Sequence, residues 1–184
     1  MIFQANENDL TRLLQPVRLL LLDVDGILTD GKLFFTSSGE EMKAFSTLDG
    51  HGIKMLRSTG VDVGIITGRT SKILERRASD LGISILYQGR EDKLNALEEI
   101  CSEREITPAQ IAYAGDDLPD LPVLLTVAAA FSVPGAHEDI KQRVMAITTS
   151  QAGAGAVREI CDFIMRSQGN YDQFLEAGTR RSSP

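Results

Sequence analysis

Short runs of aliphatic residues alternate with segments of helical periodicity along most of this 184-residue chain. The aliphatic runs predict strands at residues 17–24, 61–67, 84–88, 111–115, 127–133 and 144–149. Helices are predicted between them, at residues 48–60, 70–82 and 90–105. After them, residues 152–169 predict a Gly/Ala-rich turn that leads into an amphipathic helix. Strands that alternate with helices form parallel sheets through right-handed crossovers. The pattern therefore predicts the α/β class, with a three-layer, doubly wound parallel sheet in one domain over residues 1–184.

The segment at residues 31–46 departs from this alternation, because two strand-like runs flank a Ser-Ser-Gly turn and predict a β-hairpin. A lone hairpin is marginally stable in water. This one carries a large apolar load for its length, namely Leu33, Phe34, Phe35, Met42 and Phe45. Either the hairpin folds back on its own sheet, or it pairs with copies of itself in a homo-oligomer, which we favour.

Composition and charge argue against several classes of function. A net charge of -7 argues against a nucleic-acid partner, which needs a basic face, whereas a small anionic substrate remains compatible. No apolar run approaches the roughly 20 residues of a membrane helix, so no membrane partner is expected. We interpret Cys101 and Cys161 as reduced core residues of a cytoplasmic protein. The last residues of the tail at 170–184 are expected to be disordered.

Polar residues follow four of the predicted strands, at or shortly after the point where each strand ends. They are Asp23 and Asp25, then Thr67, Gly68 and Arg69, then Lys93, and finally Asp116, Asp117 and Asp120. Taken singly, each has a plain structural interpretation as a helix cap, a turn residue or a solvated charge. The carboxyl ends of the strands meet at one edge of a doubly wound sheet, so the four groups together indicate a functional site there.

The clustered carboxylates predict a site for a hard cation. Asp23 and Asp116, with Asp117 as a further candidate, offer the oxygen ligands that Mg²⁺ prefers. The metal would offset the repulsion between the carboxylates and between Asp23 and a phosphate dianion. Asp23 is therefore a candidate nucleophile that forms an aspartyl-phosphate.

The remaining strand-end residues supply the other groups that phosphate-ester hydrolysis needs. Asp25 can act as general acid toward the leaving-group oxygen and later as general base toward water. The Thr67 hydroxyl and the Gly68 amide can bind phosphoryl oxygens at a helix start. The Lys93 ammonium can neutralise charge that builds in the transition state. Uncatalysed hydrolysis is so slow that one such group would not suffice.

The motifs "DVDG", "ITG", Lys93 and "GDDLPD" stand in an order that resembles the haloacid dehalogenase superfamily of phosphohydrolases, whose fold is Rossmann-like. A receiver domain of a signalling relay uses similar groups in a different order, because there the acidic pair follows the first strand. The resemblance implies that Asp23 is the nucleophile and Asp25 the acid/base. It also implies Mg²⁺ held by the Asp23 carboxylate, the Asp25 backbone carbonyl and Asp116, with Asp117 and Asp120 as supporting residues.

The spacing between motifs leaves no room for a cap domain, and longer stretches narrow the resemblance. "DVDGILTDGKLFF", "FSTLDGHGIKML", "IITGRTSKILERRASDLGI" and "GAVREICD" resemble the family of 3-deoxy-D-manno-octulosonate 8-phosphate phosphatases of lipopolysaccharide synthesis. That family implies a homotetramer joined through its hairpins and a sugar-acid phosphate substrate. The substrate contacts that it implies are Asp25, Ser46, Thr47, Leu48, Asp49, Gly50, Lys54, Gly68, Arg69, Arg77 and Lys93.

Two other functions remain open at this point. One is a phosphatase for a nine-carbon, sialic-acid-like sugar phosphate, whose family tends to carry Glu where this chain has Arg69. The other is a non-catalytic, phosphatase-like assembly module, which would be expected to lack a motif carboxylate. Lys54 and Ala154 stand where many relatives carry arginine or another cation, which concerns the fine substrate preference.

Overall fold

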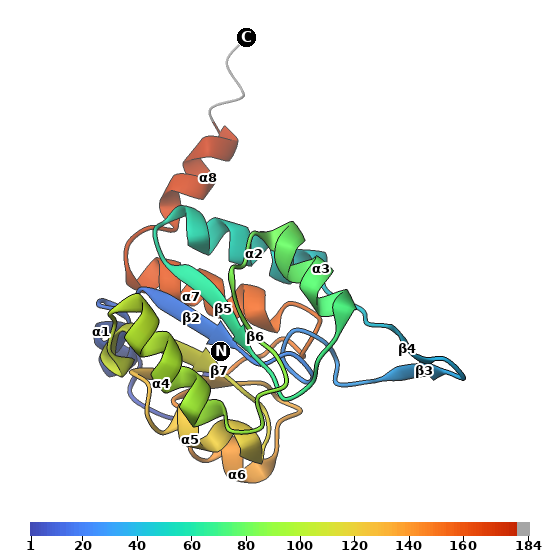
Figure 1. Ribbon diagram of the computed structural model, residues 1–184. Coiled ribbons are helices and arrows are strands. Elements are labelled where there is room, and N and C mark those ends of the chain that lie inside the picture. The colour runs from blue at the N-terminus through green and yellow to red at the C-terminus, as the bar shows by residue number, and fades with distance from the viewer. Residues whose placement is uncertain (180–184) are drawn as a thin grey trace.

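The structure is a computed structural model that describes residues 1–179, without the side chains of residues 40–41 and 177–179. Its main sheet has the strand order β1-β9-β8-β7-β2-β5-β6 (Figure 1). These strands are β1 (Ile2–Phe3), β2 (Leu19–Leu22), β5 (Asp62–Ile66), β6 (Ile85–Tyr87), β7 (Ile111–Ala114), β8 (Ala129–Ser132) and β9 (Ala146–Ile147). All neighbours run parallel except β1, which is antiparallel to β9.

The predicted α/β class is confirmed, and each predicted strand is present in the sheet. The antiparallel edge strand β1 was not predicted, because two residues carry no periodicity. Only its pairing with β9 through Ile2 and Ile147 defines it as a strand. An edge position of this kind is common in otherwise parallel sheets.

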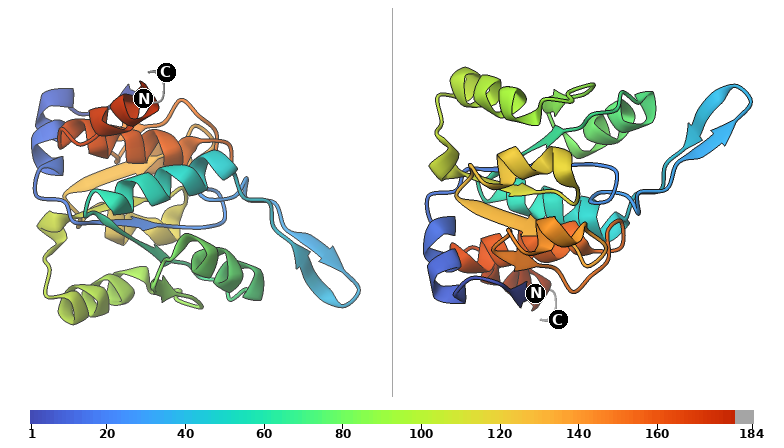
Figure 2. Two further views of the ribbon diagram at one scale, coloured as in Figure 1. Left: turned by 90° about the horizontal axis from the view of Figure 1, so that it is seen from above. Right: turned by 90° about the horizontal axis from the view of Figure 1, so that it is seen from below.

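Helices cover both faces of the sheet. They are α1 (Glu7–Leu14), α2 (Thr47–Ser58), α3 (Lys72–Leu81), α4 (Lys93–Arg104), α5 (Leu121–Leu124), α6 (Glu138–Lys141), α7 (Ala156–Ser167) and α8 (Asp172–Thr179), with short 3₁₀ turns at η1 (Pro108–Gln110) and η2 (Leu118–Asp120). α2 and α7 pack together on one face, whereas α4 and α5 pack together on the other (Figures 1 and 2). The predicted three-layer arrangement is therefore present.

The four predicted helices are confirmed with shorter bounds, and four further helices, α1, α5, α6 and α8, were missed. α5 and α6 are single turns, too short for a periodic signal. α1 did carry a signal, since Leu10 and Leu14 are four residues apart and both are fully buried, and Asn6 caps its first turn. The described residues contain no helix that is both long enough and apolar enough to cross a membrane.

Strand β2 is an interior strand of the sheet, with β7 on one side and β5 on the other. Its four leucines are buried, as expected for a strand covered on both faces. Leu22 pairs with Ile65 of β5 and with Ala114 of β7. The register therefore brings the residues after β2, β5 and β7 to the same edge of the sheet.

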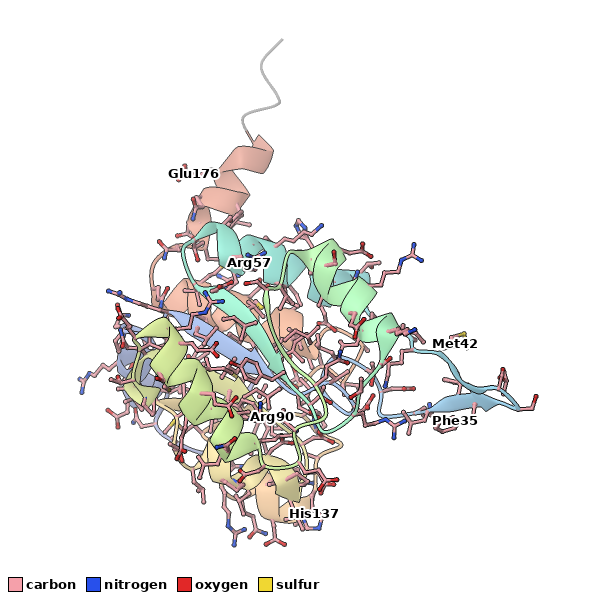
Figure 3. All side chains as sticks on the ribbon, in the orientation of Figure 1. Phe35, Met42, Arg57, Arg90, His137 and Glu176 are labelled. Atoms are coloured by element: carbon pink, nitrogen blue, oxygen red, sulfur yellow. The ribbon has the colours of Figure 1, made fainter. Side chains whose placement is uncertain are left out.

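The predicted hairpin is present as β3 (Phe34–Thr36) and β4 (Gly39–Met42), which form a separate two-stranded sheet. It projects from the body at the carboxyl edge of the main sheet (Figures 1 and 2). The alternative that it folds back on its own sheet is therefore wrong. Phe35 and Met42 lie out on the projection (Figure 3), and the exposed fractions of Phe34, Phe35 and Met42 are 44%, 62% and 54%.

The predicted tail at residues 170–184 is ordered over the part that the structure describes, up to residue 179. Tyr171 and Phe174 pack against the core, and the Arg166 guanidinium lies 3.7 Å from the centre of the Tyr171 ring. α8 follows, and the predicted disorder concerns residues 180–184, which lie outside the described residues.

Candidate active site

A cavity of about 550 Å³ opens at the carboxyl edge of the sheet, where the strand-end residues were expected to meet. It is lined by Asp23, Asp25, Thr67, Gly68, Arg69, Arg90, Glu91, Lys93, Asp116, Asp117, Pro119 and Asp120. Every strand-end residue singled out in the sequence is among them. Residues up to 97 positions apart in the chain are thus brought into one site by the parallel register, as from Asp23 to Asp120.

Lys93 connects two carboxylates at the floor of this cavity. Its Nζ lies 2.8 Å from Oδ1 of Asp23 and 2.6 Å from Oδ1 of Asp120, and all three residues are buried. Burial by itself would lower the pKa of the Lys93 ammonium, but the two carboxylates outweigh it and hold that pKa above its ordinary value. Lys93 therefore stays charged and holds one oxygen of Asp23 in place.

Asp120 is fully engaged by donors from its own surroundings. Its Oδ1 also accepts a hydrogen bond from the Tyr113 hydroxyl at 2.5 Å. Its Oδ2 accepts from the backbone N–H groups of Asp116 and Asp117, at 3.0 and 3.2 Å. Asp120 thus shapes the loop after β7 and orients Lys93. Tyr113, which was not predicted, is fully buried, and burial next to Asp120 and Asp23 raises the pKa of its hydroxyl well above the ordinary value.

Asp23 and Asp116 have the properties expected of metal ligands. Carboxylate oxygens of Asp23, Asp116 and Asp120 lie within 4.8 Å of one another. Burial, together with Asp120, raises the pKa of Asp23 to about 6. Burial, together with Asp23 and Asp120, raises the pKa of Asp116 to about 8. A bound divalent cation would relieve the repulsion between these clustered carboxylates, which is one cause of their raised pKa values. The donor set therefore fits Mg²⁺.

Gly26 shows how closely the two acidic loops approach each other. Its φ is +105°, and a Cβ built at this position would stand 2.1 Å from Oδ2 of Asp116. The glycine of the "DVDG" motif therefore makes room for the Asp116 carboxylate beside Asp23. Asp117, the further metal candidate, instead directs its Oδ1 to the backbone N–H of Leu118 at 2.8 Å. Its carboxylate caps the turn after β7.

Asp25 faces a different set of partners from Asp23, although only one residue separates them. Its Oδ1 lies 2.5 Å from Nζ of Lys43 and 3.4 Å from Oγ1 of Thr29. Its Oδ2 lies 3.6 Å from Nε of Arg69. Lys43, whose side chain is only 1% exposed, was not predicted, because it lies in the hairpin segment and belongs to no motif.

The loop after β5 presents the predicted phosphate-binding groups. Thr67 is buried, and its hydroxyl oxygen accepts a hydrogen bond from the Arg69 N–H at 3.5 Å. A Cβ built on Gly68 would meet no atom within 4 Å, so the space beside its backbone is open. The Arg69 guanidinium lies 6.0 Å from the centre of the Phe35 ring, which places it between the hairpin and the cavity.

Seven predicted substrate contacts do not line the cavity of this chain, namely Ser46, Thr47, Leu48, Asp49, Gly50, Lys54 and Arg77. Asp49 is 1% exposed, and its carboxylate accepts hydrogen bonds from the N–H groups of Gly155 and Arg158 at the start of α7. These bonds join α2 to α7 through the Asp49 carboxylate. Lys54 lines a separate hollow beside α8.

Ser46 and Arg77 form a small unit at the start of α2. The Ser46 hydroxyl caps that helix, and its carbonyl accepts a hydrogen bond from Nη2 of Arg77 at 3.1 Å. The Arg77 guanidinium lies 5.7 Å from the centre of the Phe45 ring, and Gly50 backs closely onto it. Thr47 and Leu48 are exposed at the first turn of α2.

Arg90 and Glu91 line the cavity and were missed. Arg90 lies next to α4 (Figure 3), where its guanidinium donates to both carboxylate oxygens of Glu99, at 2.8 and 2.6 Å. It also lies 5.3 Å from the centre of the Tyr87 ring. A signal was available, since both residues stand between a predicted strand and Lys93, which is where strand-end residues converge.

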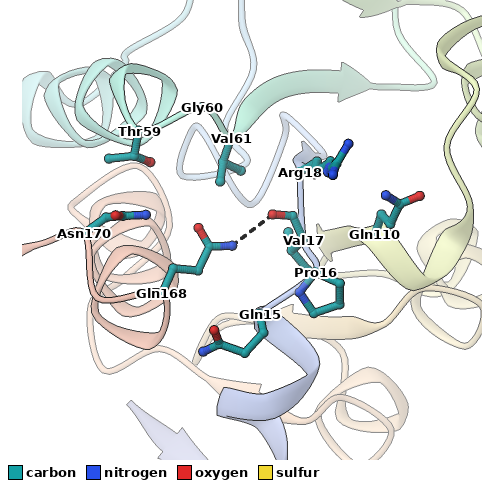
Figure 4. A pocket seen from close by; sticks show the side chains of 10 residues that line it. All are labelled: Gln15, Pro16, Val17, Arg18, Thr59, Gly60, Val61, Gln110, Gln168 and Asn170. Atoms are coloured by element: carbon teal, nitrogen blue, oxygen red, sulfur yellow. Dashed lines mark hydrogen bonds between the residues drawn. The ribbon is translucent and has the colours of Figure 1, made fainter.

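A second cavity lies at the opposite, amino edge of the sheet (Figure 4). Its volume is about 390 Å³, and its lining consists mostly of amide and apolar groups such as those of Gln15, Val17 and Gln168. Gln168 donates from Nε2 to the carbonyls of Leu14 and Val17, both at 2.9 Å. Arg18 is the charged residue among the described residues that line this cavity, and no carboxylate is among them, so the cavity lacks the acidic cluster found at the carboxyl edge.

Comparison with known proteins places this geometry among phosphatases. The family model described as haloacid dehalogenase-like hydrolase matches residues 86–160. A 3-deoxy-D-manno-octulosonate 8-phosphate phosphatase of Yersinia pestis is 46% identical, over 83% of this chain and 81% of the relative. The enzyme of that name from Escherichia coli strain K12 is 43% identical, over 86% of this chain and 85% of the relative.

A solved structure agrees with these relatives. It is the 3-deoxy-D-manno-octulosonate 8-phosphate phosphatase of Moraxella catarrhalis in complex with a magnesium ion, a phosphate ion and a KDO molecule. Its TM-score is 0.91 at 41% identity, and the match covers 94% of this chain and 99% of that chain. The described architecture is thus shared over nearly the whole length of both proteins.

Proposed function

This chain belongs to the 3-deoxy-D-manno-octulosonate 8-phosphate phosphatase family of the haloacid dehalogenase superfamily, and from that premise we propose a Mg²⁺-dependent hydrolysis at the carboxyl-edge cavity. The substrate is the 8-phosphate of that eight-carbon sugar acid, and the products are the free sugar acid and phosphate, in lipopolysaccharide biosynthesis. The observation that carries the proposal is the joining of Asp23, Lys93 and Asp116 in one cavity, with Asp25 held apart by its own partners.

The donor set assigns the residues that would hold the metal. These are the carboxylates of Asp23 and Asp116 and, as the resemblance implies, the backbone carbonyl of Asp25. Asp120 is not in this set, because each of its oxygens already accepts two hydrogen bonds. Bound Mg²⁺ supplies positive charge that lets a phosphate dianion approach Asp23.

The first half of the reaction transfers the phosphoryl group to the protein. A carboxylate oxygen of Asp23 attacks phosphorus, and the bond between phosphorus and the sugar oxygen breaks. Asp25 gives its proton to that sugar oxygen, so the sugar acid leaves as a neutral alcohol at this carbon. The Thr67 hydroxyl, the Gly68 N–H and the Lys93 ammonium hold the phosphoryl oxygens and balance their charge.

The second half releases phosphate and restores the site. A water molecule attacks the phosphorus of the aspartyl-phosphate, and Asp25 accepts the proton that the water loses. The bond between phosphorus and Asp23 breaks, and Asp23 is again a carboxylate. Asp25 thus acts first as an acid and then as a base, and its hydrogen-bond partners differ from those of the Asp23–Lys93 pair.

Substrate recognition and assembly complete the proposal. Arg69, at the mouth of the cavity beside the hairpin, is the cation that we assign to the substrate carboxylate. The exposed apolar residues Phe34, Phe35 and Met42 support a homotetramer joined through the hairpins. In such an assembly Ser46, Thr47, Leu48, Lys54 and Arg77 would meet substrate at a subunit boundary, whereas the buried Asp49 and Gly50 would support that segment from within.

The cytoplasm is the compartment that we propose for this reaction. Cys101 and Cys161 are both free thiols, and Cys161 is fully buried, in agreement with the interpretation as reduced residues. Burial raises the pKa of both thiols, so neither is activated as a nucleophile.

Phosphate release from a panel of substrates tests the proposed function. The panel contains the eight-carbon and nine-carbon sugar-acid phosphates and a hexose phosphate, each with Mg²⁺ and each with a chelator in its place. We expect kcat/KM for the eight-carbon substrate to exceed that for the hexose phosphate by at least about 10²-fold, because a site built around a charged substrate group rejects an analogue that lacks it. The nine-carbon substrate carries the same carboxylate and differs in chain length, so we expect its kcat/KM to fall between the other two. Equal, weak activity on all substrates would leave the hydrolysis standing and remove the assigned substrate.

A further inference from the structure

The environment of Asp25 is asymmetric at the level of single oxygen atoms. Oδ1 is held by the ammonium of Lys43 at 2.5 Å and lies 3.4 Å from the Thr29 hydroxyl. Oδ2 is buried and accepts no hydrogen bond within the described part of the chain. Nε of Arg69 lies 3.6 Å from it. One oxygen of the carboxylate is therefore fixed, and the other is left for a further partner.

We propose that Lys43 is a positioning residue of the phosphatase reaction, which holds Oδ1 of Asp25 so that Oδ2 is the oxygen that exchanges the proton. This inference rests on the proposed function and deepens it. A carboxylate held at one oxygen cannot rotate freely about its Cβ–Cγ bond. The oxygen that reaches the leaving group in the first half of the reaction then also reaches the attacking water in the second half.

The burial of Lys43 supports a specific role for this residue. Its side chain is 1% exposed, and a buried ammonium is costly unless it meets a counter-charge. Asp25 is 18 residues away in the sequence, so the pair forms only when the hairpin has returned to the body. Most lysines near a hairpin keep their charge in water, as Lys32 does with a side chain 73% exposed.

The place of Lys43 in the chain gives the pair a second consequence. Lys43 follows directly on Met42, the last residue of β4, and Met42 pairs with Phe34 of β3. Whatever fixes the hairpin therefore also fixes the side chain that orients Asp25. This gives a physical route by which association through the hairpins would raise turnover at the cavity of the same chain.

A comparison of two leaving groups tests the role of Lys43. The sugar phosphate loses an alkoxide, which needs a proton as it departs, whereas p-nitrophenyl phosphate loses a stabilised phenolate, which does not. The ratio kcat/KM reports the steps up to departure of that group. For Lys43→Met we expect kcat/KM to fall about 10²-fold on the sugar phosphate and less than about threefold on p-nitrophenyl phosphate.

Companion variants separate positioning from other causes. Lys43→Arg keeps a cation that can donate to Asp25, but a guanidinium does not itself act as a proton donor. If Lys43 acts only by positioning, we expect kcat/KM of Lys43→Arg to lie within about tenfold of that of the unmodified enzyme. Thr29→Val removes the weaker contact to Oδ1, and we expect the same selectivity with a smaller loss. Lys32→Met removes an exposed cation from the segment just before β3 and serves as the matched control. We expect its kcat/KM to be unchanged on both substrates.

The outcomes distinguish this inference from the proposed function. Equal losses on the two substrates for Lys43→Met, or no loss on either, would overturn the role of Lys43 while hydrolysis by the unmodified enzyme stands. If Lys43→Met does not fold, the same comparison on Thr29→Val decides the matter. Failure of the unmodified enzyme to release phosphate from either substrate would instead overturn the proposed function.

Discussion

The two edges of the central sheet carry cavities of comparable size and opposite chemistry. The carboxyl edge gathers Asp23, Asp116 and Lys93 in a buried cluster with shifted pKa values. The amino edge holds amide groups and the Arg18 side chain but no carboxylate among the described lining residues, and Gln168 there donates to two backbone carbonyls. The same strands contribute to both edges. A cavity is thus no guide to function by itself, and the residues that follow the strands decide which edge is reactive.

The largest effect that would sharpen this contrast is loss of the nucleophile. Asp23→Asn keeps the size of the side chain but removes the attacking oxygen charge, and we expect turnover to fall at least about 10⁴-fold. Phosphate release measures it, and light scattering should show an unchanged molecular mass. Asp9→Asn, an exposed aspartate on α1, is the matched control. Turnover of Asp23→Asn within tenfold of the unmodified enzyme would remove Asp23 as nucleophile.

The hairpin belongs to the carboxyl edge alone, and its disruption tests whether that edge needs a second subunit. Phe34 and Met42 are cross-strand partners and both are exposed. We expect Phe34→Ser with Met42→Ser to give a monomer by light scattering. We also expect kcat/KM for the sugar phosphate to fall by about 10²-fold, because substrate contacts and the anchoring of Lys43 are both weakened.

The control for the hairpin variant is Leu125→Ser, which changes a leucine that is 64% exposed outside the hairpin. Its mass and activity should not change. A fully active monomer from the double variant would show that each carboxyl-edge cavity works alone, and it would separate the hairpin from catalysis.

Magnesium should stabilise the protein through the carboxyl edge, and more strongly at high pH. The pKa of Asp23 is raised to about 6 and that of Asp116 to about 8, so the contribution of these two carboxyl groups to the stability of the metal-free fold is greatest at low pH, where both are neutral. That stability is lost as the pH rises through these values and the charges appear. Mg²⁺ relieves the charges and competes with protons for the same oxygens.

Thermal unfolding with and without Mg²⁺ measures this effect. With Mg²⁺ at about 100 times its Kd the gain is about 2.7 kcal/mol, which corresponds to about 5–10 °C in Tm for a chain of this size. We expect this gain near pH 8.5 and less than half of it near pH 5. Asp116→Asn should abolish the response at both values. A shift that is equal at the two pH values would contradict a metal site formed by these carboxylates.

The smallest predicted effect concerns the amino edge, where only stability should change. Gln168→Ala removes a half-buried donor from two carbonyls, and we expect a loss of about 1–3 kcal/mol in the free energy of unfolding. Turnover per folded molecule should remain the same. Gln173→Ala, which removes an exposed bond to Asn170, is the control and should cost less than about 0.5 kcal/mol. A large loss of turnover in Gln168→Ala would contradict the claim that the amino edge contributes to stability and not to catalysis.

The sequence by itself determined six of the seven strands of the main sheet, the edge at which chemistry gathers and most of the residues that line the cavity there. Aliphatic runs and helical periods are local, so the order of elements and the position of Asp23, Thr67, Lys93 and Asp116 after their strands could be predicted. The hairpin could be predicted too, because its turn and its alternation are local. The edge strand β1 could not, because its pairing with β9 is the only thing that makes it a strand.

Only the tertiary structure decided which atoms meet within the site. It joined Lys43 to Asp25 across the hairpin, engaged Asp120 with Tyr113 and Lys93, and turned the predicted substrate contact Asp49 toward α7. Such pairings depend on side-chain direction and on the return path of distant segments, which leave no periodic trace in the chain. A buried charge takes the partner that the folded chain brings within reach, since leaving it alone is too costly.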